Sequence, residues 1–262
     1  AKIQYALAQL NIEKNVTSAF YGVYQAYKRL VTAREAFQSQ KENYELIKNK
    51  VEQGLIAQEE LFQAEVTLAT NENSLADTEM SYENTKDQFK QTLGLPLDID
   101  ISILPNIQID PVQVDVNQAV KYALDQRMEI RQQQIAIEEG IFSLIEAKDN
   151  NKFKGSISAR VGLIMLDVRQ LCRELPKLLR QIDIARQTVS NAERTYDINV
   201  EKYRNGALTG MELKNQQTQL TDAKNALTDA IISYKLRLLD LKIQTLWDFQ
   251  NNKSYLPVDL LK

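Results

Sequence analysis

The side chains that usually carry enzymatic chemistry are scarce in this sequence. It has no histidine, which excludes a Ser-His-Asp triad and any zinc site that needs an imidazole ligand. Its one cysteine, Cys172, excludes an internal disulfide and a CxxC site. The adjacent carboxylates Glu138 and Glu139 point to different faces of a predicted helix, so they do not form a catalytic pair. We therefore expect a protein that is not an enzyme and that needs no cofactor and no metal.

The composition excludes further classes of partner and fold. The formal net charge is −3, and the charged residues, 26% of the chain, mix both signs, which gives no footprint for nucleic acid. With 8 glycines and 5 prolines in 262 residues, the chain has few turn formers, which favours a small number of long helices. No window approaches the roughly 20 apolar residues of a membrane-spanning helix. No secretory signal precedes the first helical pattern, so we expect either a cytosolic protein or a mature or truncated form.

The elements that must position any site are long helices. Apolar residues recur at steps of three and four residues along four segments, which is the period of amphipathic helices. They predict a first helical hairpin over 1–94 with its tip at 51–57, and a second over 166–250 with its tip at 203–210. An arm of about 40 residues is about 60 Å long at a rise of about 1.5 Å per residue. The pattern therefore predicts extended, coiled-coil-like antiparallel hairpins in a mainly α-helical protein.

A region of different character connects the two hairpins. Residues 95–151 begin with irregular chain and continue into a helix that starts at an acidic cap near Asp115. Residues 152–165 predict a β-strand, because apolar residues alternate there with polar or small ones. Both a short soluble strand and one strand of a membrane barrel fit this length, since barrel strands have about 9–11 residues. Residues 251–262 form a non-helical tail.

The two hairpins are predicted to be copies of one unit. Gly54 and Gly206, which break the two pairs of arms, are 152 positions apart, and many other pairs match at this offset without a gap. Because helix breakers, apolar positions and tyrosines all match in one register, we infer a duplicated hairpin. The matching pairs include Ala33 with Ala185, Arg34 with Arg186, Tyr44 with Tyr196, Lys50 with Lys202, Glu60 with Glu212, Leu61 with Leu213, Leu68 with Leu220 and Tyr82 with Tyr234.

Together these features resemble the TolC-type outer-membrane efflux protein family. The tips at 51–56 and 203–209 each contain a glycine and are each followed by an acidic residue and a leucine. The Leu-Gly-Leu-Pro sequence at 93–96 is similar to the family's end of the first hairpin. Residues 123–130 are similar to the family's Ala-Leu…Arg-Pro-Glu-Leu segment, with methionine where proline is usual. The segment 152–163 stands where the family has a strand, and the resemblance covers most of the chain.

The resemblance implies an architecture and a set of partners. Three protomers form one hollow cylinder, with long helices as the wall of a periplasmic tunnel, an equatorial segment around its middle, and short strands that close a shared barrel in the outer membrane. The tips meet a periplasmic adaptor (a membrane fusion protein), which links the duct to an inner-membrane pump. The family has four strands and this sequence predicts one. We therefore expect a truncated form whose barrel is largely missing.

The function implied by the resemblance is that of an outer-membrane efflux duct subunit. Such a subunit is a passive periplasmic tunnel that exports small molecules or proteins as part of a tripartite pump. The alternative is a periplasmic coiled-coil scaffold or adaptor-type hairpin protein with no transport role. That alternative explains the long arms, but it leaves the duplication and the predicted strand unexplained.

Five residues resemble the family's adaptor-docking tips. A structural role as a simple helix–helix turn is the alternative, because glycine is common at a helix C-terminus for steric reasons alone. The candidate docking residues are Gly54, Leu55, Gly206, Leu208 and Thr209.

Four further residues align with the constricted end of the family's tunnel. Glu60 and Glu212 fall at acidic positions that face the passage, and Asn215 falls where a second acidic residue is often seen. Tyr203 resembles a tip tyrosine that helps to hold the closed state, but Leu208 stands where its basic partner is expected. For the two glutamates, the alternative is a purely structural role in the first turn of a helix, where the helix dipole stabilises a negative charge.

Overall fold

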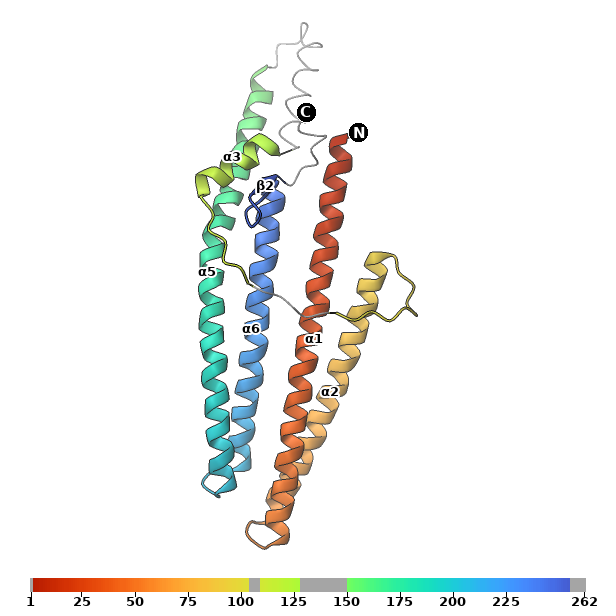
Figure 1. The fold of residues 1–262 in the computed structure, drawn as a ribbon, viewed down its shortest axis with the longest axis vertical. Helices are drawn as coiled ribbons and strands as arrows, with labels where there is room; N and C mark the ends of the chain where they lie inside the picture. Colours follow the sequence, from red (N-terminus) through yellow and green to blue (C-terminus); the bar gives the residue numbers. More distant parts are fainter. Residues whose placement is uncertain (1, 104–108, 128–149, 255–262) are drawn as a thin grey trace. The chain divides into compact units, whose positions relative to one another are not determined.

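The computed structural model describes residues 2–103, 109–127 and 150–254, and these are mostly α-helical (Figure 1). Two long helical hairpins, α1–α2 and α5–α6, account for most of them, which confirms the predicted mainly α class. The elements are α1 (Lys2–Glu52), α2 (Gln58–Leu93), α3 (Val116–Gln126), α5 (Asn150–Arg204), α6 (Gly210–Thr245), β1 (Trp247–Asp248) and β2 (Lys253–Ser254). The two short strands pair with each other in an antiparallel sense.

The helix boundaries repeat between the two hairpins. Helices α2 and α6 each have 36 residues. Their first and last residues, and the last residues of α1 and α5, are all shifted by the 152 positions that separate Gly54 from Gly206. The structure therefore shows the duplicated hairpin that the matching pairs predict.

Both hairpins turn at a glycine whose backbone is left-handed. The φ angle is 71° at Gly54 and 74° at Gly206. In the first turn, the Gly54 N–H donates to the Val51 carbonyl and the Leu55 N–H to the Lys50 carbonyl, both at 2.9 Å. The second turn repeats the two bonds at the equivalent positions, at 3.0 and 2.9 Å. This Schellman pattern satisfies carbonyls of the last helical turn, and it favours glycine because a Cβ atom is strained at positive φ.

The β-strand predicted over 152–165 is wrong, because these residues belong to α5, which begins at Asn150. The alternation that indicated a strand also contains a helical spacing, since Ile157, Val161, Ile164 and Val168 are three or four positions apart. Ile164 and Val168 are buried. A helix extends cooperatively once it has formed, so the strongly helical run after residue 166 continues back through this ambiguous stretch. The predicted strand remnant is therefore a helix.

Part of the predicted connecting region lies outside the described residues. Asp115 caps α3 as predicted, since its carboxylate accepts a hydrogen bond from the backbone N–H of Gln118 at 2.9 Å. The continuation of this helix over 128–149, with the paired glutamates at 138–139, lies outside the described residues, and so do residues 255–262 of the predicted tail.

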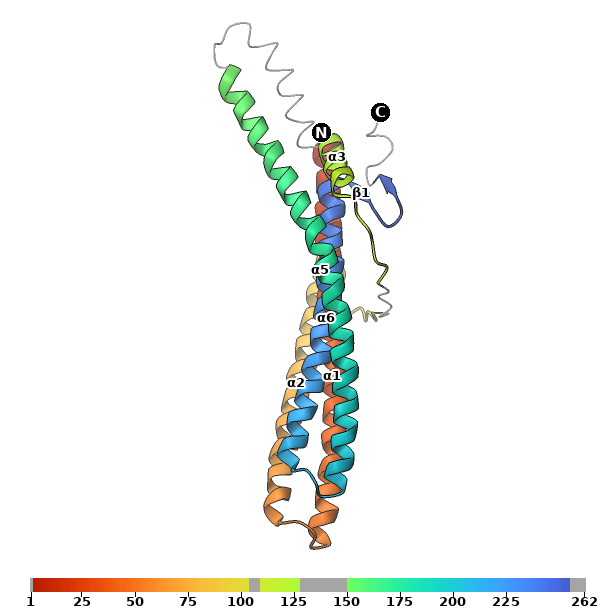
Figure 2. The ribbon, with the colours of Figure 1, turned by 90° about the vertical axis from the view of Figure 1, so that its left-hand side faces the viewer.

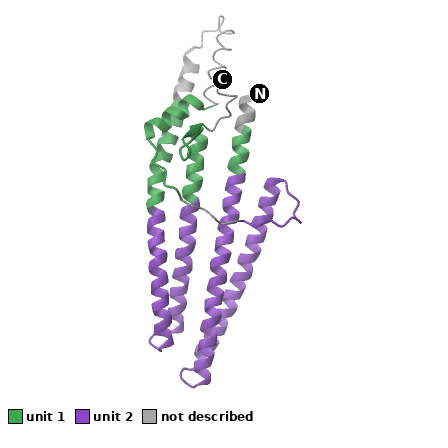
Figure 3. Cartoon of the chain, viewed as in Figure 1, with its two compact units in different colours: residues 1–15, 107–180, 233–262 green, residues 16–106, 181–232 purple. Residues whose placement is uncertain are grey.

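The chain divides into two compact units, and neither is a continuous stretch of sequence (Figure 3). Unit 1 consists of residues 1–15, 107–180 and 233–262, and unit 2 of residues 16–106 and 181–232. Helices α1, α5 and α6 contribute to both units. Figure 2 shows the turns of both hairpins at the same end of unit 2. The candidate docking and constriction residues therefore all belong to one unit.

Unit 1 is organised by aromatic residues. The rings of Tyr122 in α3 and Trp247 in β1 are stacked, with their centroids 4.1 Å apart. The fully buried Tyr234 of α6 donates its hydroxyl hydrogen to the Asp110 carbonyl at 3.3 Å and accepts from the Val112 N–H at 3.2 Å. These contacts attach α3 and the extended segment before it to the end of the second hairpin.

Helix α6 ends differently from its counterpart α2. The residue after α2 is Gly94, with a φ angle of 68°, whereas the equivalent position after α6 is Leu246, with a φ angle of 54°. A left-handed leucine costs about 1–2 kcal/mol relative to glycine. Leu246 is buried in unit 1, and the apolar contact that comes with burial offsets this strain.

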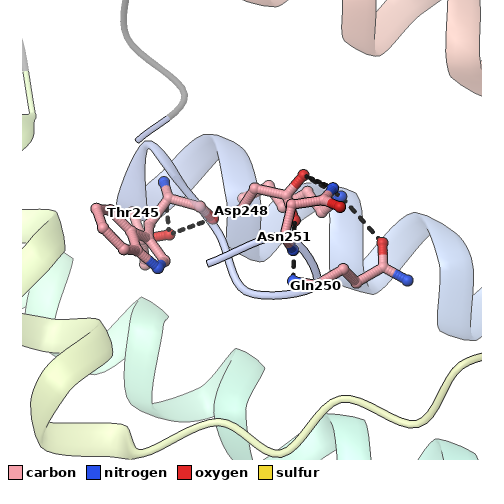
Figure 4. Close-up of polar contacts among 6 residues, drawn as sticks. Thr245, Asp248, Gln250 and Asn251 are labelled. Carbon is pink, nitrogen blue, oxygen red and sulfur yellow. Dashed lines mark hydrogen bonds and ion pairs between the residues drawn. The ribbon is translucent and has the colours of Figure 1, made fainter. Parts of the chain in front are cut away.

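A cluster of polar contacts around Asp248 holds the turn that follows Leu246 (Figure 4). The Asp248 carboxylate accepts from the backbone N–H groups of Gln250 and Asn251, at 2.9 and 3.1 Å, and from the Lys242 ammonium at 3.1 Å. Burial raises the pKa of Asp248, but the hydrogen bonds from Asn251 and Lys242 outweigh it, so the pKa lies below its ordinary value. The carboxylate is therefore ionised at neutral pH and fixes the start of the β1–β2 hairpin.

Candidate functional site

An open pocket of about 280 Å³ lies between the two hairpin tips in unit 2, and we call it the tip cavity. It contains five of the nine predicted site residues. The other four, Gly54, Leu55, Glu212 and Asn215, lie outside its lining. The tip cavity is lined by Lys50, Ile56, Ala57, Glu60, Tyr203, Gly206, Leu208, Thr209 and Gly210.

Tyr203 lies at the centre of the packing between the tips. It is buried in an apolar cluster with Ile47, Ala64 and Leu213, which come from both hairpins. Burial, followed by the nearby charge of Glu60, raises the pKa of Tyr203 to about 12. The phenol therefore stays protonated at neutral pH and contributes mainly apolar surface and a neutral hydroxyl group to the site.

Lys50 joins the two tips by a contact that the sequence analysis missed. Its ammonium donates to the backbone carbonyls of Tyr203 and Arg204, at 2.9 and 2.8 Å, and lies 5.0 Å from the centre of the Tyr203 ring. These carbonyls are in the last turn of α5, where acceptors lack intrahelical partners and the helix dipole favours a cation. We call this contact the Lys50 latch. Position 208 is a leucine, so the basic side chain next to Tyr203 is that of Lys50.

Glu60 reaches from the first hairpin toward the second. Its carboxylate lies 3.4 Å from the place where a Cβ atom on Gly210 would be. Gly210 is the first residue of α6, so the negative charge of Glu60 lies beside the positive end of that helix dipole. Glu60 thus lies close to the start of α6 as well as in the first turn of its own helix.

Glu212 is used within its own helix. Its carboxylate accepts from the Thr209 backbone N–H at 2.9 Å and from the Thr209 hydroxyl at 2.8 Å, while the Glu212 N–H donates to the Thr209 oxygen at 3.2 Å. This is a capping box. The hydrogen bond from the Thr209 backbone, followed by the one from its hydroxyl, lowers the pKa of Glu212. These contacts favour the structural role weighed for Glu212, while its role at a constriction stays a prediction.

The first tip presents the more exposed apolar surface. Leu55 is 66% exposed next to Gly54, whereas Leu208 at the second tip is half-buried in the tip cavity. Asn215 lies exposed on the first turns of α6.

The described residues offer neither a metal centre nor a membrane-spanning helix. No three or more histidine, cysteine, aspartate or glutamate side chains among them are arranged to hold a metal ion. None of their helices is both long enough and apolar enough to cross a membrane.

The sequence matches no protein-family model and no curated protein, but its fold matches solved structures. The outer-membrane channel OprN superposes with a TM-score of 0.74 at 14% identity, over 95% of this chain and 69% of that one. CusC, described for transmembrane channel formation, superposes with a TM-score of 0.72 at 13% identity, over 93% and 70%. The open MtrE outer membrane channel of Neisseria gonorrhoeae gives 0.70 at 13% identity, over 93% and 67%. The chain therefore has the helical fold of these outer-membrane channels.

Proposed function

We propose that this chain is the periplasmic, helical part of an outer-membrane efflux duct subunit and that it acts as a passive tunnel. The observation that carries the proposal is the tip site, where two copies of one long hairpin end in matching turns and are joined by the Lys50 latch. The fold shared with solved outer-membrane channels supports the same function.

In this proposal the exposed tips dock on a periplasmic adaptor. Leu55 and Gly54 form the first docking tip, and Gly206, Leu208 and Thr209 form the second. The adaptor connects the duct to an inner-membrane pump, which supplies the energy for export, and three copies of the chain form the tunnel wall. The protein itself makes and breaks no covalent bond, so it is not an enzyme and needs no cofactor.

The tunnel narrows at the tips and opens there. Glu60 and Glu212 place negative charge near the passage, which disfavours anions, and Tyr203 and Asn215 lie beside them. Opening requires the Lys50 ammonium to leave its two carbonyl partners. A hydrogen bond to a charged group contributes about 1.5–3 kcal/mol at a buried site, and we expect about 1 kcal/mol for each bond of the half-buried Lys50. Adaptor contact at the tips can supply free energy of this size.

Channel recordings on the complete gene product in planar lipid bilayers test this function. We expect a low conductance for the unmodified protein and a conductance several-fold higher for Lys50→Ala, because that variant loses the latch. Lys48→Ala, at an exposed position of the same helix, serves as the matched control and is expected to leave the conductance unchanged. A protein that inserts but never conducts, with or without Lys50, contradicts the proposal and favours the scaffold alternative.

A further inference from the structure

The side chain of Gln40 is a polar group without a protein partner. Gln40 lies on α1 and is 6% exposed, so its amide is almost completely removed from bulk solvent. The described residues supply no hydrogen bond to this side chain. A buried amide that makes no hydrogen bond destabilises a fold, because it has lost its bonds to water and gained none in return. The Gln40 amide therefore requires a partner that is not part of the chain.

Gln40 lines a small pocket between α1, α2 and α6 of unit 2, which we call the Gln40 pocket. Its volume is about 20 Å³. A polar pocket can hold a water molecule once its volume reaches about 10–15 Å³. The Gln40 pocket therefore has room for one water molecule and too little room for a polyatomic solute.

The charged groups on the wall of the Gln40 pocket balance each other. Glu60 on α2 and Lys214 on α6 both line it, and neither has an ion-pair partner among the described residues. Gly210, the first residue of α6, brings the positive end of that helix dipole to the same wall. The carboxylate disfavours an anion, and the ammonium group and the helix dipole together disfavour a cation. The wall therefore favours a neutral, polar occupant of the size of water.

The hydrogen-bonding groups of this wall match the capacity of one water molecule. Thr67 lines the pocket from α2, and its hydroxyl already donates its hydrogen to the Gln63 carbonyl at 2.8 Å, so towards the pocket it can only accept. The carboxylate of Glu60 is an acceptor as well, whereas the Gln40 amide offers N–H donors. A water molecule can thus donate to Glu60 and Thr67 and accept from Gln40, which gives it the roughly three hydrogen bonds typical of buried water.

We propose that one water molecule is bound in the Gln40 pocket, where it accepts from the Gln40 amide and donates to the Glu60 carboxylate and the Thr67 hydroxyl oxygen. This water joins α1 to α2 and restrains the carboxylate that lies beside Gly210. Glu60 and Gly210 also line the tip cavity, so the bridge supports a wall that the two pockets share. The water site does not depend on transport, and we expect it in a duct and in a scaffold alike.

The first copy of the hairpin has the groups for this site, and the second copy lacks them. The repeat equivalent of Gln40 is Ala192, whose methyl group forms no hydrogen bond. The repeat equivalent of Thr67 is Gln219, which is exposed on α6. We therefore expect no second water of this kind at the equivalent positions.

Magnetic relaxation dispersion of the water oxygen nucleus tests the proposal, because it counts the water molecules that stay bound far longer than those at the protein surface. Gln40→Leu removes the amide and keeps a side chain of similar size. We expect this variant to lose one long-lived water and to have a melting temperature lower by about 2–4 °C. Gln219→Leu, at an exposed position of α6, is the matched control and leaves both quantities unchanged.

A second pair of variants tests the contact with Thr67. Thr67→Val replaces the hydroxyl by a methyl group of similar size, and we expect it to lose the same water. Thr67→Ser keeps the hydroxyl and is expected to retain the water. Circular dichroism shows whether each variant keeps its helices, and if Gln40→Leu does not fold, the pair at Thr67 decides.

Three results overturn the proposal. A higher melting temperature of Gln40→Leu with an unchanged number of long-lived waters shows that the native amide is dry, since removing an unpaired buried group stabilises a fold. A lower melting temperature without the loss of a water shows that Gln40 acts by packing alone. A water that is retained in both Thr67 variants, or lost from both, is not held by the Thr67 hydroxyl. None of these measurements depends on conductance, so a failure of the proposed duct leaves the water site unaffected.

Discussion

The two hairpin tips turn in the same way but begin their returning helices differently. Both turns use a left-handed glycine and the same pair of backbone hydrogen bonds. At the start of α6, Thr209 and Glu212 form a capping box, whereas Ala57 at the start of α2 has no side-chain cap. Glu60 is consequently free to lie beside Gly210 of the other hairpin. Alanine at position 57 stands where the second copy has Thr209. Because of this difference, Glu212 caps its own helix, whereas the equivalent Glu60 contacts the other hairpin.

The largest expected effect comes from removing the central side chain of the tip. Tyr203→Ala leaves a cavity in the buried cluster with Ile47 and Leu213, and we expect it to lower the free energy of unfolding by about 3 kcal/mol. Val51→Ala, at the repeat-equivalent and half-buried position, should cost less than half as much. Urea denaturation followed by circular dichroism measures both. Equal losses would contradict the central place of Tyr203 in the packing of the tips.

The turn glycines should give the next largest effect. Gly54→Ala and Gly206→Ala each force an alanine into the left-handed region, and we expect a loss of about 1 kcal/mol from each. No heavy atom lies within 4 Å of a Cβ built on either glycine, so the loss reports on the backbone alone. Gly22→Ala in the helical interior of α1 is the control of opposite sign, with a gain of about 0.5–1 kcal/mol. Thermal denaturation of the three variants distinguishes these signs, and a loss at Gly22 would refute the assignment.

Exchanging the helix caps should give a smaller effect, and it tests the difference between the two tips most directly. Thr209→Ala removes the exposed cap of α6, and we expect it to lower the free energy of unfolding by about 0.5 kcal/mol. Ala57→Thr should create a capping box with Glu60 and draw its carboxylate away from Gly210. Since the charge of Glu60 contributes to the raised pKa of Tyr203, that pKa should fall in Ala57→Thr. Absorbance titration of the tyrosines, compared with that of a Tyr203→Phe variant, isolates the change. An unchanged Tyr203 titration would show that Glu60 had not moved.

The smallest effect is a dependence of stability on acid pH. The folded pKa of Glu212 is lowered, so its contribution is present above the ordinary glutamate pKa, 4.5, and is lost as the pH falls through the folded value. Glu212→Gln should therefore flatten the decline of the unfolding midpoint below that pH. Glu60→Gln is the matched variant without a capping box and is expected to change this slope less. A larger change of slope in Glu60→Gln than in Glu212→Gln would contradict the assignment of the acid-sensitive cap to the second hairpin.

The long helices and their turns could be predicted because the responsible signals are local. Apolar spacing and the glycines at 54 and 206 act over one or two helical turns, and the repeat offset combined these signals into a duplicated hairpin. The segment 152–165 was mispredicted because its short alternation is compatible with two periods. The cooperativity of a helix of 55 residues decides between them, and no local window contains that information.

The tip site could be predicted only in part, because its main contact is distant in sequence. The Lys50 latch joins residues more than 150 positions apart, and nothing near Lys50 indicates which carbonyls it binds. One indication of the Lys50 latch was present in the sequence, namely the match between Lys50 and Lys202. A cation in the last turn of a helix is stabilised by the helix dipole, and both copies have one there. The capping box, in contrast, was readable from the sequence Thr209-Gly210-Met211-Glu212, which Ala57 interrupts in the first copy.

The stack of Trp247 on Tyr122 provides an optical reporter for one half of the molecule. Trp247 is the single tryptophan of the chain, and it lies in unit 1. Its fluorescence therefore follows the environment of unit 1 alone, while circular dichroism follows the helices of both units. If the two signals give one melting curve, then the helices shared by the two units transmit unfolding from one to the other. If the curves separate, the tips can loosen while unit 1 stays folded, which is the mechanical property that the proposed duct requires for opening at one end.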